Sequence, residues 1–256
     1  LSLLGVDICE AGFPISSPVR IVEDFMRDNV VADLADIDNE GLLVVFDSES
    51  WMGSSVQYSG VNYDGGLLSG WTGMANLSTF DSNQKFRGMV NMGELGFFII
   101  WDDDRNGSSD IYGQKIDSNG NIVGDSGGIP IAVGVNDQTE PSVTYNQNLN
   151  EVMVCWEDYR SGTYYDIYCN SISGDDLTVG NEIALSTLSY NQRYPFVYST
   201  LGDSYLITWQ DSRNDPGENL APDDDIYIQK NIQVGIGTFD AYIFSQGTDE
   251  NNQNIV

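Results

Sequence analysis

The sequence contains no histidine, and this absence removes several classes of function. Histidine is the most common general base, a frequent zinc ligand and the partner in every Ser-His or Cys-His nucleophile. Cysteine is nearly as scarce: the chain has only Cys9, Cys155 and Cys169, and none of them belongs to a Cys-x-x-Cys pair. The usual zinc sites and the histidine-dependent hydrolases are therefore excluded.

Basic residues are also in short supply. Ten Lys and Arg stand against 39 Asp and Glu, which gives a formal net charge of −29. Nucleic-acid phosphates and anionic membrane surfaces repel such a chain, so we expect neither as a partner. No apolar run approaches the roughly 18 residues of a membrane-spanning helix, so we expect no membrane insertion. The acidic excess favours a saline or calcium-containing exterior, where charge is screened or bound.

An internal repeat dominates what the sequence does contain. The segment Trp101–Tyr112 recurs at Trp156–Tyr168 and from Trp209 to Tyr227, and a weaker copy begins at Phe46. The copies lie roughly 54 residues apart and share the pattern W-x-D-x-R followed by D-I-Y. The motif residues are Trp101, Asp103, Arg105, Asp110, Trp156, Asp158, Arg160, Asp166, Trp209, Asp211, Arg213 and Asp225.

The second strand expected in each repeat is apolar on both faces, as in Phe97–Trp101 and Val152–Trp156. A sheet with one wet face would alternate apolar and polar residues, so these sheets need cover on both sides. Four-stranded antiparallel sheets stacked around an axis meet that need at this repeat length. A β-sandwich lacks such repeats, and the coils of a β-solenoid are shorter.

The sequence therefore predicts a single all-β domain, a β-propeller of four-stranded antiparallel blades. Four complete repeats are expected over residues 28–82, 83–136, 137–190 and 191–247. In the third repeat we expect strands at Pro141–Tyr145, Glu151–Trp156, Asp166–Ile172 and around Glu182–Leu185.

Both ends of the chain are expected to belong to a further, partial blade, made by residues 1–27 and 248–256. Either five blades close into a ring through the termini, or the chain is part of a larger propeller. The start at Leu1 without Met leaves open a removed signal peptide or a longer parent chain.

The run from Trp101 to Gln114, W-x-D-x-R-x-G…D-I-Y-x-Q, resembles the repeats of secreted bacterial and archaeal β-propeller proteins, which often belong to large surface or adhesin-like chains. The resemblance covers about residues 28–247 and implies a propeller at the cell surface or outside the cell. It implies no particular ligand, because that family hosts varied functions. The first repeat lacks the Trp, the Arg and the Asp-Ile-Tyr, which implies a different loop surface on that blade.

The motif arginines are expected to be structural. Arg105, Arg160 and Arg213 each follow an aspartate by two positions, and a further aspartate opens the next strand. A guanidinium can bind such flanking carboxylates in bidentate fashion and so tie the hairpin loop to its strand. Acids that repeat in every blade favour a scaffold role, because catalytic acids would be unique to particular blades.

Acidic loops offer the oxygen ligands that calcium prefers, and calcium is the one cofactor that the sequence suggests. The candidate ligands are Asp102, Asp104, Asn106, Asp223 and Asp224. Neither the stretch that contains Asp102, Asp104 and Asn106 nor the one with Asp223 and Asp224 reproduces an EF-hand loop. The alternative is that these are solvated acidic loops without a metal.

Three further features suggest covalent or surface roles. Cys155 and Cys169 are equally far from the turn of one hairpin, which leaves open a disulfide or two buried thiols. Glycosylation sequons begin at Asn76 and Asn106. Trp51 and Trp71 lie outside the strict repeat and are the candidates for surface contacts.

We expect a structural or adhesive extracellular module rather than an enzyme, with other copies of itself, other surface proteins or glycans as partners. The alternative is a carbohydrate-binding, lectin-like propeller, in which aromatic residues stack on sugars. A third hypothesis is a glycoside hydrolase with acids around the central axis.

Overall fold

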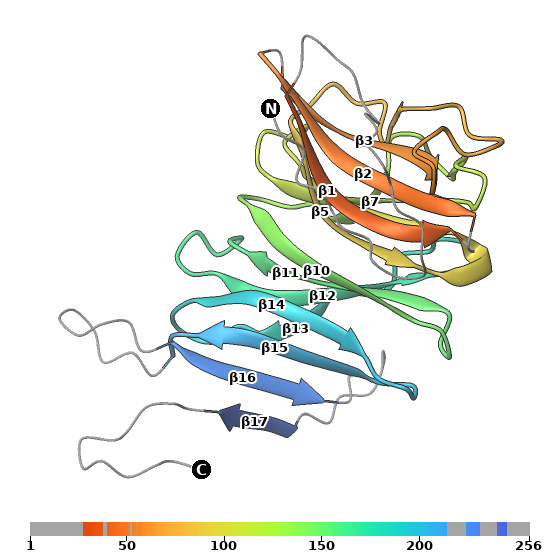
Figure 1. The fold of residues 1–256 in the computed structure, drawn as a ribbon. Coiled ribbons are helices and arrows are strands. Elements are labelled where there is room, and N and C mark those ends of the chain that lie inside the picture. Colours follow the sequence, from red (N-terminus) through yellow and green to blue (C-terminus); the bar gives the residue numbers. More distant parts are fainter. Residues whose placement is uncertain (1–27, 38–39, 52, 214–223, 231–239, 245–256) are drawn as a thin grey trace.

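The computed structural model describes residues 28–37, 40–51, 53–213, 224–230 and 240–244. These residues form four antiparallel sheets that follow one another along the chain and stack face to face (Figure 1). Each sheet is a blade and lies within one of the four predicted repeats. Residues 1–27 and 248–256, expected to make a partial blade, lie outside the described residues.

The strands pair in chain order within each blade, except that β8 and β9 of the second blade both pair with β7. The first blade contains β1 (Asp28–Ile37), β2 (Gly41–Ser50), β3 (Gly53–Asn62) and β4 (Ala75–Asn76). The second contains β5 (Gln84–Asn91), β6 (Phe97–Asp103), β7 (Asp110–Ile116), β8 (Ile122–Val123) and β9 (Ile129–Ala132), and a short 3-10 helix, η1 (Gly93–Leu95), joins β5 to β6. The third contains β10 (Gln138–Asn146), β11 (Glu151–Asp158), β12 (Asp166–Ser173) and β13 (Ile183–Ser186). The fourth contains β14 (Gln192–Ser199), β15 (Tyr205–Asp211), β16 (Asp225–Lys230) and β17 (Asp240–Phe244).

The hydrophobic core consists mainly of three layers, one between each pair of neighbouring blades. Alternate residues of β6 enter different layers: Trp101 packs with the first blade, and Phe98 packs with the third. Alternate residues of β11 do the same, since Trp156 packs toward the second blade and Met153 toward the fourth. Because both faces of these strands are buried, each strand removes apolar surface from water on two sides. This burial is the main source of stability here. The predicted all-β propeller architecture is confirmed.

The fourth blade differs because β15 is buried on one face only. Tyr205, Ile207 and Trp209 are buried against the third blade, whereas Leu206 and Thr208 are partly exposed. Every residue of β6, by contrast, is buried. Among the described residues, the outer face of the fourth blade therefore lacks the cover that the inner blades have.

The first strands of successive blades, β1, β5, β10 and β14, lie next to one another on the axial side of the stack. Each of them carries a β-bulge at the same height, just before the residue that pairs with Val45, Ile100, Cys155 or Thr208. A bulge adds a residue outside the ladder and re-aims the side chains around it. The bulges therefore shape the axial surface.

The prediction that Trp71 is available for surface contacts is wrong, because its side chain is buried. Its ring packs edge-on against Tyr58, with ring centroids 6.2 Å apart. Gly60 and Gly120 leave the space for it, since a Cβ at either position would lie 2.4 or 2.5 Å from the indole. Trp51, the other candidate, is 89% exposed.

No helix in the described part of the chain is long and apolar enough to cross a membrane.

Candidate functional site

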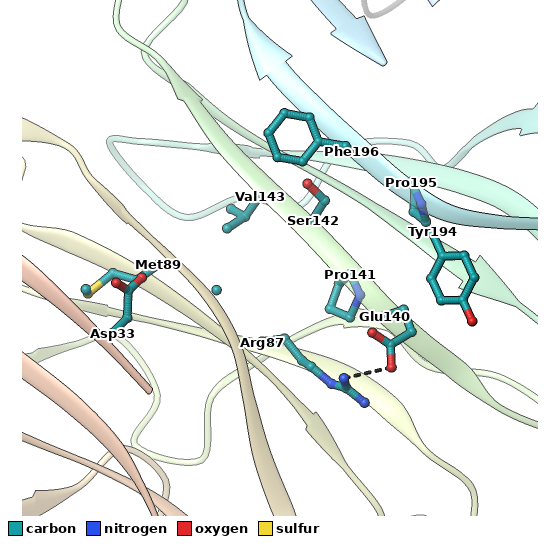
Figure 2. Close-up of a pocket in the computed structure, with 11 residues that line it drawn as sticks. Asp33, Arg87, Met89, Glu140, Pro141, Ser142, Val143, Tyr194, Pro195 and Phe196 are labelled. Atoms are coloured by element: carbon teal, nitrogen blue, oxygen red, sulfur yellow. Dashed lines mark hydrogen bonds and ion pairs between the residues drawn. The ribbon is translucent and has the colours of Figure 1, made fainter. Parts of the chain in front are cut away.

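A cleft of about 430 Å³ opens on the axial surface, where the four first strands meet (Figure 2). It takes residues from every blade, so it is a property of the assembled stack rather than of one repeat. Its lining is Asp33, Arg87, Gly88, Met89, Glu140, Pro141, Ser142, Val143, Tyr194, Pro195 and Phe196.

The bulges of the third and fourth blades give this lining its shape. Glu140 and Tyr194 have φ values of 48° and 52°, in the left-handed region that residues with side chains rarely adopt. Each precedes a proline, Pro141 or Pro195, which restricts the backbone further. Such conformations cost about 1–3 kcal/mol each and cluster at ligand-binding and active sites. The strain therefore marks the cleft as a candidate functional site.

Arg87 links two acids at the floor of the cleft. Its Nη1 lies 2.8 Å from Oε1 of Glu140, and its Nε donates a 2.6 Å hydrogen bond to Oδ2 of Asp102 on β6. Figure 2 shows the Arg87 and Glu140 side chains pointing toward each other. The guanidinium thus fixes the Glu140 carboxylate from the neighbouring blade.

Asp102 lies behind Arg87 and is only 7% exposed. Its Oδ1 is buried and has no hydrogen-bond partner among the described residues. Burial raises the pKa of Asp102 to about 6, although the charge and the hydrogen bond of Arg87 oppose the shift. The Asp102 carboxylate beside Arg87 is therefore expected to take up a proton at mildly acidic pH.

Asp33 supplies the second carboxylate of the cleft. Figure 2 shows it beside Met89, on the other side of the cleft from Tyr194. Its Oδ1 accepts a 2.8 Å hydrogen bond from the backbone N–H of Leu34. The strand register places Gly88, Ser142 and Phe196 at the equivalent positions of the other blades, so this acid does not repeat.

The second position of the W-x-D motif connects neighbouring blades. Asp47 accepts a 2.8 Å hydrogen bond from the backbone N–H of Phe86. Glu157 accepts one of 2.7 Å from Tyr194, and Arg193 donates to the same carboxylate at 3.0 Å. Burial raises the pKa of both acids, against these hydrogen bonds. These acids hold the bulged strands, and hence the cleft lining, in position.

The repeated motif forms a compact contact set away from the cleft lining. The indole Nε1 of Trp101, Trp156 and Trp209 donates to the aspartate two residues later at 2.9, 3.0 and 2.9 Å. The arginine of each motif pairs with the same aspartate. Each guanidinium also stacks on the tyrosine of D-I-Y, 3.8 to 3.9 Å from the centroids of Tyr112, Tyr168 and Tyr227.

The first aspartate of the motif is buried and firmly bound. Burial alone would raise the pKa of Asp103 and Asp211, but hydrogen bonds from the arginine and the tryptophan outweigh it, so both values are lowered. The second aspartates, Asp110, Asp166 and Asp225, stand directly opposite the first across the hairpin. These like-charged pairs need the neighbouring arginine for compensation.

Beyond the shared aspartate, the arginines have different partners. Arg160 also pairs with Glu182 at 2.7 Å, whereas Arg105 donates to the carbonyl oxygen of Gly127 at 2.8 Å. Arg213 donates to Ser186 in the preceding blade at 3.3 Å. Asp110 instead accepts from Asn106 at 2.7 Å and from the Gly134 N–H at 3.2 Å.

The predicted calcium ligands have separate partners. Asp102 binds Arg87, and Asp104 accepts two hydrogen bonds from Asn83 at 2.8 and 2.7 Å. Asp224 accepts from Ser212 at 2.5 Å and from Gln210, and Asp223 lies outside the described residues. In the part of the chain that the structure describes, no group of three acids or cysteines could hold a metal ion. Calcium binding stays a prediction that these residues do not fit.

Both sequon asparagines are exposed, but their side chains have different hydrogen-bond partners. The side chain of Asn76 is exposed, and its Oδ1 accepts a 2.7 Å hydrogen bond from Gln57. The Nδ2 of Asn106, the atom that glycosylation would modify, already donates to Asp110 and to the hydroxyl of Tyr112.

Cys155 and Cys169 stand opposite each other on β11 and β12 and form a disulfide with an S–S distance of 2.13 Å. Both sulfurs lie in the core layer between the third and fourth blades. Cys9 lies outside the described residues.

No model of a known protein family matches the chain. No curated protein sequence matches it either. Among solved structures, the fold is similar to that of the GH93 α-L-arabinofuranosidase of Fusarium graminearum in complex with arabinobiose, with a TM-score of 0.52 and 12% identity over 82% of this chain and 64% of that one. It is also similar to a thermostable family-43 glycoside hydrolase (TM-score 0.43, 14% identity, 84% and 72% covered) and to an endo-arabinase from Bacteroides thetaiotaomicron (0.42, 13%, 83% and 73%).

These comparisons correct the prediction that the chain is not an enzyme. That prediction assumed that the conspicuous acids all belong to the repeated scaffold. The arabinofuranosidase with a TM-score of 0.52 is an enzyme built on this fold, and Asp33 and Glu140 are cleft acids that do not repeat. The non-enzymatic interpretation is therefore overturned.

The sequence did not single out Asp33, Arg87 and Glu140, because they lie in the first strands of their blades and not in the repeated Trp-Asp-Arg motif. One signal was present. The flank Asn136–Val143 resembles Asn191–Val197, and both contain a proline after a variable residue. Those prolines mark the bulges that reach the cleft.

Proposed function

We propose that this chain is a carbohydrate-active propeller that binds a glycan in the axial cleft and hydrolyses a glycosidic bond there. The observation that carries the proposal is the pair of non-repeating carboxylates, Asp33 and Glu140, in one strained cleft with Arg87. Glycoside hydrolysis needs two carboxyl groups on either side of the scissile bond. The described residues place such a pair in one cleft, in a chain that has no histidine.

In this proposal the two acids share the chemistry. One protonates the leaving oxygen, and the other activates water or attacks the anomeric carbon. Arg87 orients Glu140, and Asp102 in turn holds Arg87 from behind. The aromatic rings of Tyr194 and Phe196 are exposed at the cleft and give a sugar ring a surface to stack on.

The test is hydrolysis by the purified chain of a panel of 4-nitrophenyl glycosides, pentofuranosides included, and of neutral polysaccharides. The Asp33→Asn and Glu140→Gln variants should each lose about 10²- to 10⁴-fold in kcat/KM, because each removes a proton-transfer group or the nucleophile. Matched controls are Asp64→Asn and Glu94→Gln, which neutralise exposed acids elsewhere.

Full activity in both cleft variants would refute the assignment of these acids. A folded chain that hydrolyses no member of the panel would refute the proposed activity itself.

We also propose that the protein works outside the cell. The disulfide between Cys155 and Cys169 supports this, since disulfides persist mainly in oxidising compartments. The structural or adhesive role, with other copies of the chain or other surface proteins as partners, stays a prediction.

A further inference from the structure

A cluster of tyrosines next to the cleft has no role in the repeated scaffold. It consists of Tyr159, Tyr164 and Tyr165 from the loop between β11 and β12, and Tyr190 and Tyr194 at the start of the fourth blade. We call these five residues the tyrosine platform. In the second repeat, Asp104, Ser108 and Ser109 stand where the loop tyrosines would be, and the third repeat has one residue more in this loop. The platform is therefore a feature of one blade junction.

The platform contains two pairs of packed tyrosine rings and is partly open to solvent. The rings of Tyr159 and Tyr165 have centroids 4.8 Å apart, and those of Tyr164 and Tyr190 are 5.6 Å apart. The Arg193 guanidinium joins the first pair to the cleft, because it lies 4.6 Å from the centroid of Tyr165 and 4.9 Å from that of Tyr194. Tyr190 and Tyr194 are 44% and 53% exposed.

The backbone around the platform is held in place before any ligand arrives. Tyr165 donates to the side chain of Asn191 at 3.1 Å, and Gln192 donates back to the carbonyl oxygen of Tyr165 at 2.8 Å. Tyr190 shares the left-handed conformation of Tyr194, with φ of 70°. Two strained tyrosines in one short stretch, both exposed, indicate a surface shaped for contact. A preformed surface loses little entropy on binding.

The buried carboxylate of Glu157 fixes the junction between platform and cleft. It binds both the backbone N–H of Tyr194 and the guanidinium of Arg193. Tyr194 belongs to the platform and also lines the cleft (Figure 2), so a ligand chain that leaves the cleft past Tyr194 would meet the other platform residues.

We infer that the tyrosine platform binds the continuation of a neutral polysaccharide chain whose scissile bond lies in the axial cleft, an inference that rests on the proposed function. Tyrosine offers an apolar ring face for the C–H face of a sugar and a hydroxyl for its polar edge. Arg193, the cation that contacts Tyr165 and Tyr194, is already paired with Glu157, and the chain carries a net charge of −29. An anionic polymer would be repelled, whereas a neutral one would not.

The test measures binding apart from hydrolysis, by affinity electrophoresis in gels that contain arabinan, xylan or, as the anionic comparison, polygalacturonate. The wild type should be retarded by at least one neutral polymer and not by polygalacturonate. Tyr164→Ser restores the type of residue found in the second repeat, and Tyr190→Asn keeps a residue that tolerates positive φ. Each variant should bind about two- to tenfold more weakly. Tyr63→Ala, at an exposed tyrosine outside the platform, should bind as the wild type does.

The kinetic readout separates the two proposals. In the platform variants, KM for the polysaccharide should rise by a similar factor, while kcat/KM for an aryl monoglycoside stays unchanged because that substrate occupies only the cleft. Unchanged retardation and unchanged polymer KM in both folded variants would overturn the inference while leaving the proposed hydrolysis intact. Retardation that depends on the platform, in a chain without hydrolytic activity, would uphold glycan binding and refute the activity. Retardation by polygalacturonate alone would overturn the neutral-polymer assignment.

Discussion

At the scale of single residues, Asp102 carries the clearest consequence of burial. Its folded-state pKa, about 6, exceeds the ordinary aspartate value, so the folded chain holds the proton more tightly than the unfolded chain does. The stability that protonated Asp102 provides is therefore present below about pH 4 and is lost as the pH rises through about 6. This is the reverse of the behaviour of a salt-bridged carboxylate with a lowered pKa.

Asp102→Asn should remove this pH dependence, because an amide does not titrate. We expect the free energy of unfolding of the variant, relative to the wild type, to rise by about 2 kcal/mol between pH 4 and pH 7. Urea unfolding at several pH values measures it, with Asp64→Asn as the control that should run parallel to the wild type. A constant offset between Asp102→Asn and the wild type would contradict the prediction.

At the scale of the structural element, the Trp-Asp-Arg contact set explains why the motif repeats. In the second blade, Asp103 receives hydrogen bonds from the Trp101 indole and from the backbone N–H of Arg105. It also pairs with the guanidinium of Arg105, whose side chain is 8% exposed. One carboxylate therefore closes the β6–β7 hairpin and neutralises a buried cation.

Asp103→Asn should destabilise the protein by about 3 kcal/mol, because it leaves the Arg105 charge buried and without its counter-ion. The neighbouring Asp104→Asn should cost less than about 1 kcal/mol, since Asp104 is exposed and an amide oxygen can still accept from Asn83. Thermal and urea unfolding of the two variants provide the comparison. Equal losses would show that the buried ion pair is not the source of the effect.

The sequence predicted elements well where the signal was local. The strands expected at Glu151–Trp156 and Asp166–Ile172 match β11 and β12 within two residues at each end. The two-faced hydrophobicity of β6 and β11 also correctly required a blade on either side. Alternation of side chains is a property of one strand, so one stretch of sequence is enough to reveal it.

The sequence did not predict contacts that depend on distant segments. The slot for Trp71 exists because Gly120, in another blade, lacks a side chain. The cleft needs Asp33 on β1 and Glu140 on β10 to face the same space, and the bulge in each strand sets which residues do so. A bulge changes which residues of a strand face the axis. The residue pattern of one strand does not reveal how the bulges of four neighbouring strands together place side chains in the cleft.

At the scale of the whole molecule, the net charge of −29 works against compactness. Added salt screens this repulsion, because the Debye length falls from about 10 Å at 0.1 M to about 3 Å at 1 M. We expect the melting temperature to rise by roughly 5 °C or more between 0.05 and 0.5 M NaCl. A melting temperature independent of NaCl would contradict this.

The same titration tests the calcium prediction when CaCl₂ is compared with NaCl at equal ionic strength. The described loops give no cluster of ligands, so the two salts should shift the melting temperature alike if those residues act alone. A larger shift with CaCl₂ would place a cation site among the other residues of the chain.

The bulges have a consequence for how such a chain diversifies. The inserted residue of each inner strand lies outside the hydrogen-bonded ladder, so its identity can change without a change of register. Arg87, Glu140 and Tyr194 stand at this place in three successive blades: a cation, an acid and an aromatic ring. Blade duplication would first yield identical copies of this position, and substitution at one point per copy would then be enough to turn a symmetric ring of residues into an asymmetric one. Differences in side-chain chemistry between blades can therefore arise at the bulge positions, while the repeated motif residues that hold each blade together stay the same.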